Sequence, residues 1–299
     1  MGIAHYIKTI GRGRDGARAL TREQASDLMG QVLDGAVSDL EIGAFCLAMR
    51  IKGETPEEMA GFLDATGARI SRIDTSRSSS TVVLPSYNGA RRLPILTPLL
   101  AHLLAREGLS VIMHGTPTES GRVTSQDVLR AMGSDISAGV DAVKPGEVVF
   151  VPTEALCPGL KRLLQVRQVI GLRNSAHSLV KLMNVCSGNA LLLSSYTHPE
   201  YAFSMAKTLE LIGSNALLLR GTEGEAVADA RRMPQIDAFL DGVRSCLVSP
   251  QTGPLTEIPQ IPAQIDEIST AQYTQAVLNG ELSIPQPIAR QVQAILRII

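Results

Sequence analysis

The residues best able to do chemistry in this 299-residue chain lie in polar loops that follow short apolar runs. The clearest loop is MHGTPTESGR at 113–122, where His114 and Gly115 end an apolar run and Thr124 then caps a predicted helix. Such a loop binds phosphate well, because free backbone N–H groups and the helix dipole both attract an anion. This loop has no lysine and a single late arginine, so we interpret it as a degenerate phosphate loop.

Two further loops follow apolar runs, and each of them allows two interpretations. PSYNGARR carries Arg91 and Arg92, which would meet an anion near the start of the next helix, although a turn with two solvated arginines is an equal interpretation. RGTEGEAVADARR carries Glu223 and Glu225, which would suit a magnesium ion, although an exposed acidic turn is the simpler interpretation.

Neither a catalytic pair nor a metal-binding cluster stands out among the remaining residues. His102 and His114 are isolated and are predicted to be packed histidines. The cysteines are scattered without a CxxC pair, which indicates neither a zinc site nor a disulfide framework and favours a reducing compartment. They are Cys46, Cys157, Cys186 and Cys246. The sequence therefore predicts no metal and no other cofactor.

The charge distribution is more informative than the formal net charge of −1. The segment 155–199 contains no aspartate or glutamate, which predicts a basic groove able to bind phosphate backbones by releasing counterions. The opposing interpretation is that these cations pair with acids from distant segments. The predicted phosphate-binding side chains are Lys161, Arg162, Arg167, Arg173, His177 and Lys181, joined by Arg91 and Arg92 if their loop faces the same groove.

The first part of the chain is predicted to be helical. Three capping boxes, in which a hydroxyl at the N-cap faces a Gln or Glu three residues later, are followed by apolar residues at helical spacing. They are Thr21 with Gln24, Ser38 with Glu41, and Thr55 with Glu58. Pro56 suits the first turn of the third helix, and Gly35 and Gly53 end the first two. Residues 1–70 are thus predicted to form a small helical unit.

The rest of the chain alternates between buried-strand and helical patterns, which indicates a mostly parallel sheet. The predicted strands lie within 81–85, 109–115, 147–152, 189–195 and 214–221, and the helices between them within 94–107, 124–132 and 198–212. Two further helical segments, 157–170 and 175–185, are too much for one crossover and are predicted to rejoin the helical unit. The predicted fold class is α/β, with a small all-helical domain (1–75, completed by helices within 155–187) and a larger α/β domain (76–154 and 188–299).

The composition excludes several function classes. No apolar run is long enough to span a membrane, and the N-terminal stretch lacks the apolar core of a signal peptide, so a cytoplasmic protein is expected. Aromatic residues make up only 3% of the chain, which argues against base stacking as the main source of affinity for a nucleic acid.

Taken together, these stretches resemble the anthranilate phosphoribosyltransferase fold of glycosyltransferase family 3, and within it the YbiB-type, TrpD-like branch. The resemblance covers nearly the whole chain and is carried by SQDVLRAMG (125–133), VVFVPTEALCPGLKRLLQVRQVIGLRNSAH (148–177), LLLRGTEGE (217–225) and TQAVLNGELSIPQPIARQVQAIL (274–296). It implies a nucleoside phosphorylase/phosphoribosyltransferase-like architecture and a homodimer built through the helical domain.

The same resemblance exposes departures at the residues that serve phosphoribosyl pyrophosphate. The enzymes' GTGGD loop matches PSYNGARR here, their magnesium-holding serine matches Leu96, and their Lys-His-Gly-Asn-Arg keeps only His114-Gly115. Their Asp-Glu metal pair falls on Ala226-Val227, whereas Arg173 matches the arginine that meets anthranilate. These losses imply that anthranilate phosphoribosyltransferase activity is absent.

The resemblance to this branch implies sequence-independent binding of DNA or RNA by a homodimer, and the acid-free segment predicts the same property separately. A phosphoribosyl or glycosyl transferase acting on an unidentified substrate is the alternative. A small-molecule sensor that keeps an empty pocket is a third possibility.

Overall fold

The N-terminal part of the chain is helical, as predicted. The computed structural model describes residues 2–76, 80–134, 136, 141–255 and 258–299. Its first helices are α1 (Ala4–Ile10), α2 (Gly13–Gly16), α3 (Arg22–Leu33), α4 (Asp39–Lys52) and α5 (Pro56–Gly67). All three predicted capping boxes form, with both reciprocal hydrogen bonds present at the starts of α3, α4 and α5. Gly53 ends α4 with a φ of 79°, a conformation that glycine adopts without strain.

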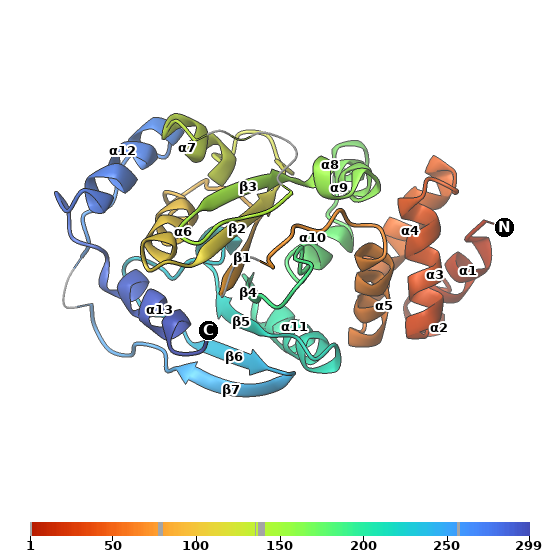
Figure 1. Cartoon of the computed structure of the whole chain (residues 1–299). Coiled ribbons are helices and arrows are strands. Elements are labelled where there is room, and N and C mark those ends of the chain that lie inside the picture. Colours follow the sequence, from red (N-terminus) through yellow and green to blue (C-terminus); the bar gives the residue numbers. More distant parts are fainter. Residues whose placement is uncertain (1, 77–79, 135, 137–140, 256–257) are drawn as a thin grey trace.

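A seven-stranded sheet in the order β3-β2-β1-β4-β5-β6-β7 forms the centre of the molecule (Figure 1). Its strands are β1 (Thr81–Ser86), β2 (Ser110–Gly115), β3 (Val148–Pro152), β4 (Leu191–Tyr196), β5 (Ala216–Arg220), β6 (Ile236–Leu240) and β7 (Val243–Val248). The first five are the predicted strands and pair in parallel, whereas β6 and β7 are added antiparallel at one edge. The predicted α/β class with a mostly parallel sheet is therefore confirmed.

The β6–β7 hairpin was not predicted, although its turn carries a recognisable signal. Asp241 and Gly242 join the two strands and have φ values of 49° and 78°. A two-residue hairpin turn requires a positive φ at both residues, and Asp-Gly is one of the pairs that adopt it most readily. The β7 strand is mostly exposed, so it lacks the apolar run that marked the other strands.

Helices cover both faces of the sheet, and successive strand residues serve two separate cores. Val82 and Leu84 point into a core shared with α6 (Thr97–Arg106) and α13 (Gln286–Leu296). Val83, between them, points into a core that continues into the N-terminal helices. The remaining helices are α7 (Ser125–Ala131), α11 (Pro199–Leu211) and α12 (Glu267–Leu278), with the 3₁₀ turn η1 (Thr222–Gly224) after β5.

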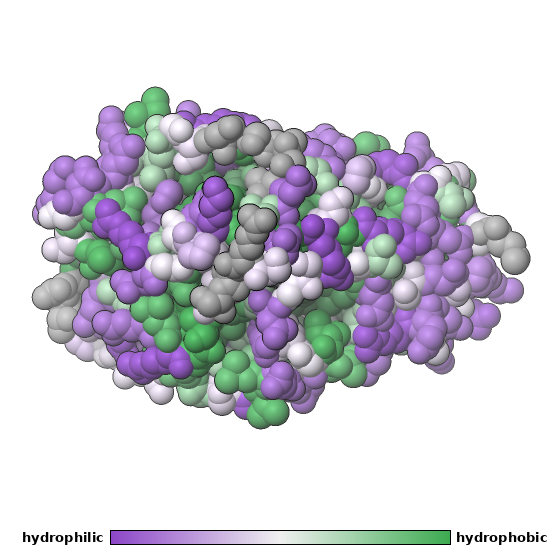
Figure 2. Space-filling model, in the orientation of Figure 1, coloured by the Kyte–Doolittle hydropathy of each residue, from purple (hydrophilic) through white to green (hydrophobic). Residues whose placement is uncertain are grey.

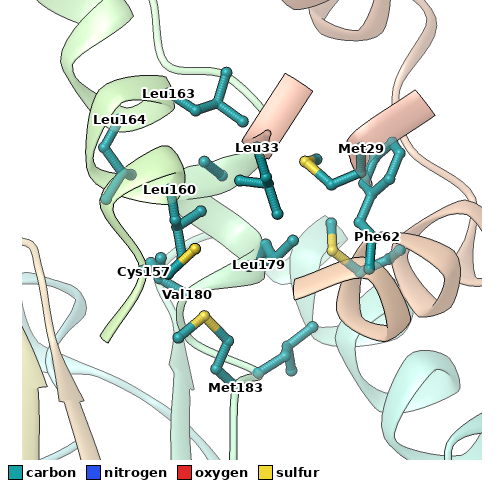
Figure 3. Close-up of a cluster of buried hydrophobic side chains, with 14 of the residues drawn as sticks. Met29, Leu33, Phe62, Cys157, Leu160, Leu163, Leu164, Leu179, Val180 and Met183 are labelled. Carbon is teal, nitrogen blue, oxygen red and sulfur yellow. The ribbon is translucent and has the colours of Figure 1, made fainter. Parts of the chain in front are cut away.

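The chain returns to the N-terminal helices after β3. Helices α8 (Thr153–Leu156), α9 (Pro158–Ile170) and α10 (Ala176–Leu179) follow, and Leu160 and Leu179 pack with Met29, Leu33 and Phe62 of α3 and α5 (Figure 3). The contact between α9 and α3 is close, since a Cβ on Gly159 would lie 2.0 Å from the carbonyl oxygen of Leu33.

The second predicted helix of this region, within 175–185, is much shorter than predicted. Only Ala176–Leu179 is α-helical, and the next backbone hydrogen bonds, such as Leu182 N–H to the Leu179 carbonyl, span three residues. Leu182, Met183 and Val185 are all buried. Because both apolar and polar side chains of this segment are buried, its pattern did not indicate where the helix ends.

The surface differs between the two parts of the molecule (Figure 2). Polar residues cover most of the visible face over α1–α5, whereas apolar residues gather along the lower edge, where α11 and the β6–β7 hairpin lie. Phe203, Leu240 and Val243 are exposed apolar residues of these elements. Among the described helices, none has the length and apolar character needed to cross a membrane.

Candidate anion-binding cleft

A cleft of about 790 Å³ lies at the carboxyl ends of the parallel strands, between the sheet and the helices that pack around α5. Its walls come from the α4–α5 turn, α9, α10, the start of α11, and the loops after β1, β2, β4 and β5. The carboxyl edge of an open parallel sheet is where such folds bind ligands, and the volume is that of a small-molecule site.

Three arginines converge on one carboxylate in this cleft. Oε2 of Glu119 lies 2.8 Å from Arg122 Nε, 3.0 Å from Arg167 Nη2 and 4.0 Å from Arg173 Nη2. Burial acts to raise the pKa of Glu119, but the hydrogen bond from Arg167 and the charges of Arg122 and Arg173 outweigh it and hold the pKa below its usual range. One carboxylate thus faces three guanidinium groups, of which Arg122 also lies 3.9 Å from Oε2 of Glu223.

Several buried side-chain nitrogens of the cleft have no hydrogen-bond partner among the described residues, including Nη1 of Arg167 and Nε2 of His177. Nδ1 of His177 lies 3.3 Å from the backbone nitrogen of Asn174 and 3.2 Å from both the carbonyl oxygen and Oδ1 of that residue. Burial, followed by the charge of Arg173, lowers the pKa of His177 to about 3, so the ring is neutral. Buried polar nitrogens normally have hydrogen-bond partners, from the protein or from ordered water.

Lys181 forms the floor of the cleft and holds the loop after β5. Its Nζ donates to the carbonyl oxygens of Gly224, at 2.7 Å, and Ser195, at 3.3 Å. Burial lowers the pKa of Lys181 to about 8, against the opposing effect of the Glu225 charge. The side chain is 9% exposed, so it contributes positive potential more than direct contact.

The loop after β1 bonds to the loop after β5. Glu225 accepts hydrogen bonds from the N–H groups of Asn88 and Gly89, and Oε1 of Glu223 accepts from the N–H of Arg92 at 2.8 Å. Glu225 is 1% exposed, so the expectation of an exposed acidic turn is wrong for this residue.

His114 and Gly115 serve the fold rather than a ligand. Nδ1 of His114 lies 2.8 Å from the hydroxyl oxygen of Tyr87, and burial lowers the pKa of His114 to about 3. A Cβ on Gly115 would lie 2.0 Å from the carbonyl oxygen of Ser86, so only glycine allows β2 to end against β1. The predicted packed histidine is confirmed.

The predicted phosphate-binding residues divide into two groups. Arg167, Arg173, His177 and Lys181 line the cleft together, with the half-buried Arg173 beside Arg167. Their segment lacks acids, but acids from elsewhere meet it, because Glu54 and Glu119 also line the cleft. The opposing interpretation of the charge pattern, pairing with distant acids, therefore holds for part of the segment.

The other group has separate contacts. Nζ of Lys161 donates to Oγ1 of Thr116 and lies 3.7 Å from a Glu154 oxygen, and Arg162 donates to the carbonyl oxygen of Val32 at 2.9 Å. These contacts fix α9 to the loop after β2 and to the end of α3. The side chains of Arg91 and Arg92 are exposed on the loop after β1, and neither is among the residues that line the cleft.

Three residues of the cleft and of the loops beside it were missed or misjudged from the sequence. Glu119 and Arg122 lie within the loop MHGTPTESGR, which was interpreted as a remnant, and Glu225 was expected at the surface. Glu119 and Arg122 could have been identified from the sequence, because their loop must lie at the carboxyl edge of the sheet near the segment 155–199. No sequence spacing indicated that Glu225 turns inward.

Comparisons with known proteins relate this chain to one family. The model of a glycosyl transferase family helical bundle domain matches residues 4–67. The uncharacterized protein YbiB of Escherichia coli K12 is 39% identical over 99% of this chain and 94% of its own length. An anthranilate phosphoribosyltransferase of Symbiobacterium thermophilum is 28% identical over 92% of this chain and 81% of its own.

Solved structures show the same fold. Anthranilate phosphoribosyltransferase (TrpD) of Thermus thermophilus superposes with a TM-score of 0.77 at 22% identity, covering 98% of this chain and 88% of that one. The Saccharomyces cerevisiae enzyme in complex with PRPP and Mg gives a TM-score of 0.70 at 13% identity, covering 99% and 89%.

Proposed function

The chain belongs to the glycosyltransferase family 3 fold group that contains YbiB and the anthranilate phosphoribosyltransferases, and we propose that its cleft binds a small phosphate-bearing substrate for a glycosyl or phosphoribosyl transfer. The substrate class is a phosphosugar or a nucleotide, which fits a cleft of about 790 Å³. The substrate differs from the anthranilate and phosphoribosyl pyrophosphate pair.

The observation that carries this proposal is the group of cleft donors without acceptors. Arg167 and His177 each keep one buried nitrogen unbonded among the described residues, beside Arg173. A phosphate group would accept from the two arginines, because guanidinium groups bind phosphate in a bidentate manner. The charge of Lys181 beneath them adds attraction without direct contact.

The magnesium and diphosphate of the related enzymes do not fit this chain. The positions that match the metal-binding Asp-Glu pair hold Ala226 and Val227, which are 2% and 3% exposed within the apolar core. The backbone N–H groups of Asn88 and Gly89, in the loop that matches the diphosphate loop, already bond to Glu225. We therefore propose no step through a metal ion.

The cleft supports charge stabilisation rather than base catalysis. Negative charge that develops on a leaving phosphate would be stabilised by Arg167 and Arg173, which are already in place before the reaction. With a pKa of about 3, His177 is neutral at pH 7, and its Nε2 would form one hydrogen bond with the substrate. It therefore positions the substrate and does not remove a proton.

A thermal-shift series tests this proposal with four probes: AMP, ribose 5-phosphate, anthranilate, and phosphoribosyl pyrophosphate with Mg²⁺. We expect AMP or ribose 5-phosphate to raise the melting temperature, and anthranilate not to be consumed in the presence of phosphoribosyl pyrophosphate. Tight binding of phosphoribosyl pyrophosphate only when Mg²⁺ is present, or no stabilisation by any phosphate compound, would contradict the proposal.

A second candidate function is sequence-independent binding of single-stranded DNA or RNA. It is favoured by the acid-free segment 155–199, which supplies three of the cleft cations, and by the exposed Arg91 and Arg92. Fluorescence anisotropy with a labelled strand of about 20 nucleotides should then show affinity that falls steeply between about 50 and 200 mM salt.

The matched variants for this candidate are Arg91→Glu with Arg92→Glu, and Arg297→Glu as a control, an exposed arginine just after α13. Loss of binding only in the first variant would support the candidate. Equal binding by both variants and the unaltered chain at low salt would rule out this loop as part of the interface.

A further inference from the structure

The loop between β1 and α6 presents two backbone donors to one buried carboxylate. Asn88 and Gly89 donate their N–H groups to Oε1 of Glu225 at 2.8 and 3.1 Å. The hydroxyl of Thr97 donates to Oε2 at 3.4 Å. Glu225 is 1% exposed, so these three donors meet a carboxylate and not water.

The donors form an anion-binding site in their own right. Gly89 has a φ of +66°, and successive N–H groups around such a residue form a concave nest that attracts anions. Thr97 begins α6, a helix of 10 residues, so the positive end of its dipole lies at the same place. A phosphate oxygen would make the contacts that Glu225 makes now.

The turn after β5 places the carboxylate of Glu225 against the loop after β1. Glu223 and Gly224 both adopt left-handed conformations, with φ values of 54° and 82°, so the chain reverses sharply before Glu225. A Cβ on Gly224 would lie 1.8 Å from Nδ2 of Asn88, so only glycine lets the two loops approach. Nδ2 of Asn88 also donates to the Glu223 carbonyl oxygen at 3.1 Å, which fixes the turn against the loop.

Lys181 compensates for the buried charge of Glu225. An isolated carboxylate is costly to remove from water unless it is hydrogen-bonded and faces a cation. The Nζ of Lys181 bonds to the carbonyl oxygen of Gly224, the residue before Glu225. The carboxylate, its three donors and the ammonium group therefore form one buried unit.

We infer that Glu225 is a built-in occupant of the anion site after β1 and excludes diphosphate from that loop. The site itself takes inorganic phosphate or pyrophosphate when this carboxylate is removed. Glu225 is thus a specificity-determining residue. The contacts of the loop carry this inference, which does not depend on the ligand proposed for the arginines.

Glu225→Ala and Glu225→Gln test the inference with inorganic pyrophosphate and no metal. In Glu225→Ala the carboxylate is absent from the anion site, and the charge of Lys181 is no longer balanced. Pyrophosphate should therefore raise the melting temperature of this variant more than that of the unaltered chain. Glutamine removes the charge but keeps an oxygen on the two N–H groups, so its gain should be small. An equal response by alanine variant and unaltered chain, or an equal gain by both variants, would overturn the inference.

A measurement on the unaltered chain covers the case in which Glu225→Ala does not fold. Amide ¹H–¹⁵N resonances are recorded while pyrophosphate is added. The Asn88 and Gly89 amides should stay in place, even at concentrations that move the side-chain Nε resonances of Arg167 or Arg173. Movement of the two amides would overturn the inference, whereas unmoved arginine resonances would count against the proposed function alone.

Discussion

At the scale of single residues, the sequence indicated four of the side chains that line the cleft. Arg167, Arg173, His177 and Lys181 were predicted from an acid-free run, and the structure brings them together. The contact of Glu119 with Arg167 was not predicted, because the two residues lie more than 40 positions apart in the chain, and Glu225 was expected at the surface although it meets the distant Asn88. Charge along a sequence shows where cations are concentrated, but not which distant acids meet them.

Glu119 competes with any anion for the arginines of the cleft. In Glu119→Gln the amide no longer pairs with Arg167 and Arg173, so we expect the affinity for inorganic phosphate to rise about tenfold, which corresponds to about 1.4 kcal/mol. Isothermal titration calorimetry measures the change. Glu281→Gln, an exposed site after α12, serves as the control. Unchanged affinity in Glu119→Gln would show that the ion pair does not limit binding.

His114 should destabilise the protein in acid. Its pKa is lowered from 6.5 to about 3 by burial, so the unfolded chain takes up a proton below pH 6.5 while the folded chain does not. Stability therefore falls as the pH drops from 6.5 towards 3, by about 2 kcal/mol at pH 5 for this residue.

Urea unfolding of His114→Asn at pH 7 and pH 5 checks this expectation. The variant keeps an acceptor near Tyr87 but cannot take up the proton, so its loss of stability between the two pH values should be about 2 kcal/mol smaller than that of the unaltered chain. His177 should contribute a similar loss in both proteins. Equal losses would mean that His114 is protonated in the folded state.

At the scale of elements, strong local sequence patterns were sufficient to predict the helices and strands that contain them. Capping boxes gave the starts of α3, α4 and α5, and apolar runs gave the five parallel strands. The exposed edge strand β7 and the short α10 were misjudged, because the first has few buried residues and the second lies in a segment buried on all sides. Periodicity reports an element only when one of its faces differs from the other.

Gly115 should be essential to the junction of β1 and β2. Gly115→Ala places a Cβ 2.0 Å from the Ser86 carbonyl oxygen, and we expect a loss of about 3 kcal/mol in the free energy of unfolding. Gly43→Ala in α4 is the matched control, because a Cβ there meets nothing within 4 Å. The control should gain about 1 kcal/mol from better helix propensity. Similar values for the two variants would show that the sheet adapts at Gly115.

At the scale of the whole molecule, we propose a homodimer formed through α4. Leu40, Leu47 and Ile51 are 84%, 48% and 66% exposed, and their spacing of seven and four residues places them on one side of that helix. Leu47→Glu combined with Ile51→Glu should be monomeric in sedimentation velocity. Phe203→Glu, equally exposed on α11, should remain dimeric. A dimer that survives the α4 change would place the interface elsewhere.

The measurement closest to the central claim is the dissociation constant for ribose 5-phosphate, determined by isothermal titration calorimetry. The unaltered chain is compared with Arg167→Ala combined with Arg173→Ala, and circular dichroism confirms that both are folded. Our account predicts saturable binding by the unaltered chain and a loss of at least about tenfold in the variant, since charge-assisted hydrogen bonds contribute about 1.5–3 kcal/mol each. Equal affinity in the two proteins, or no binding by the unaltered chain, would contradict it.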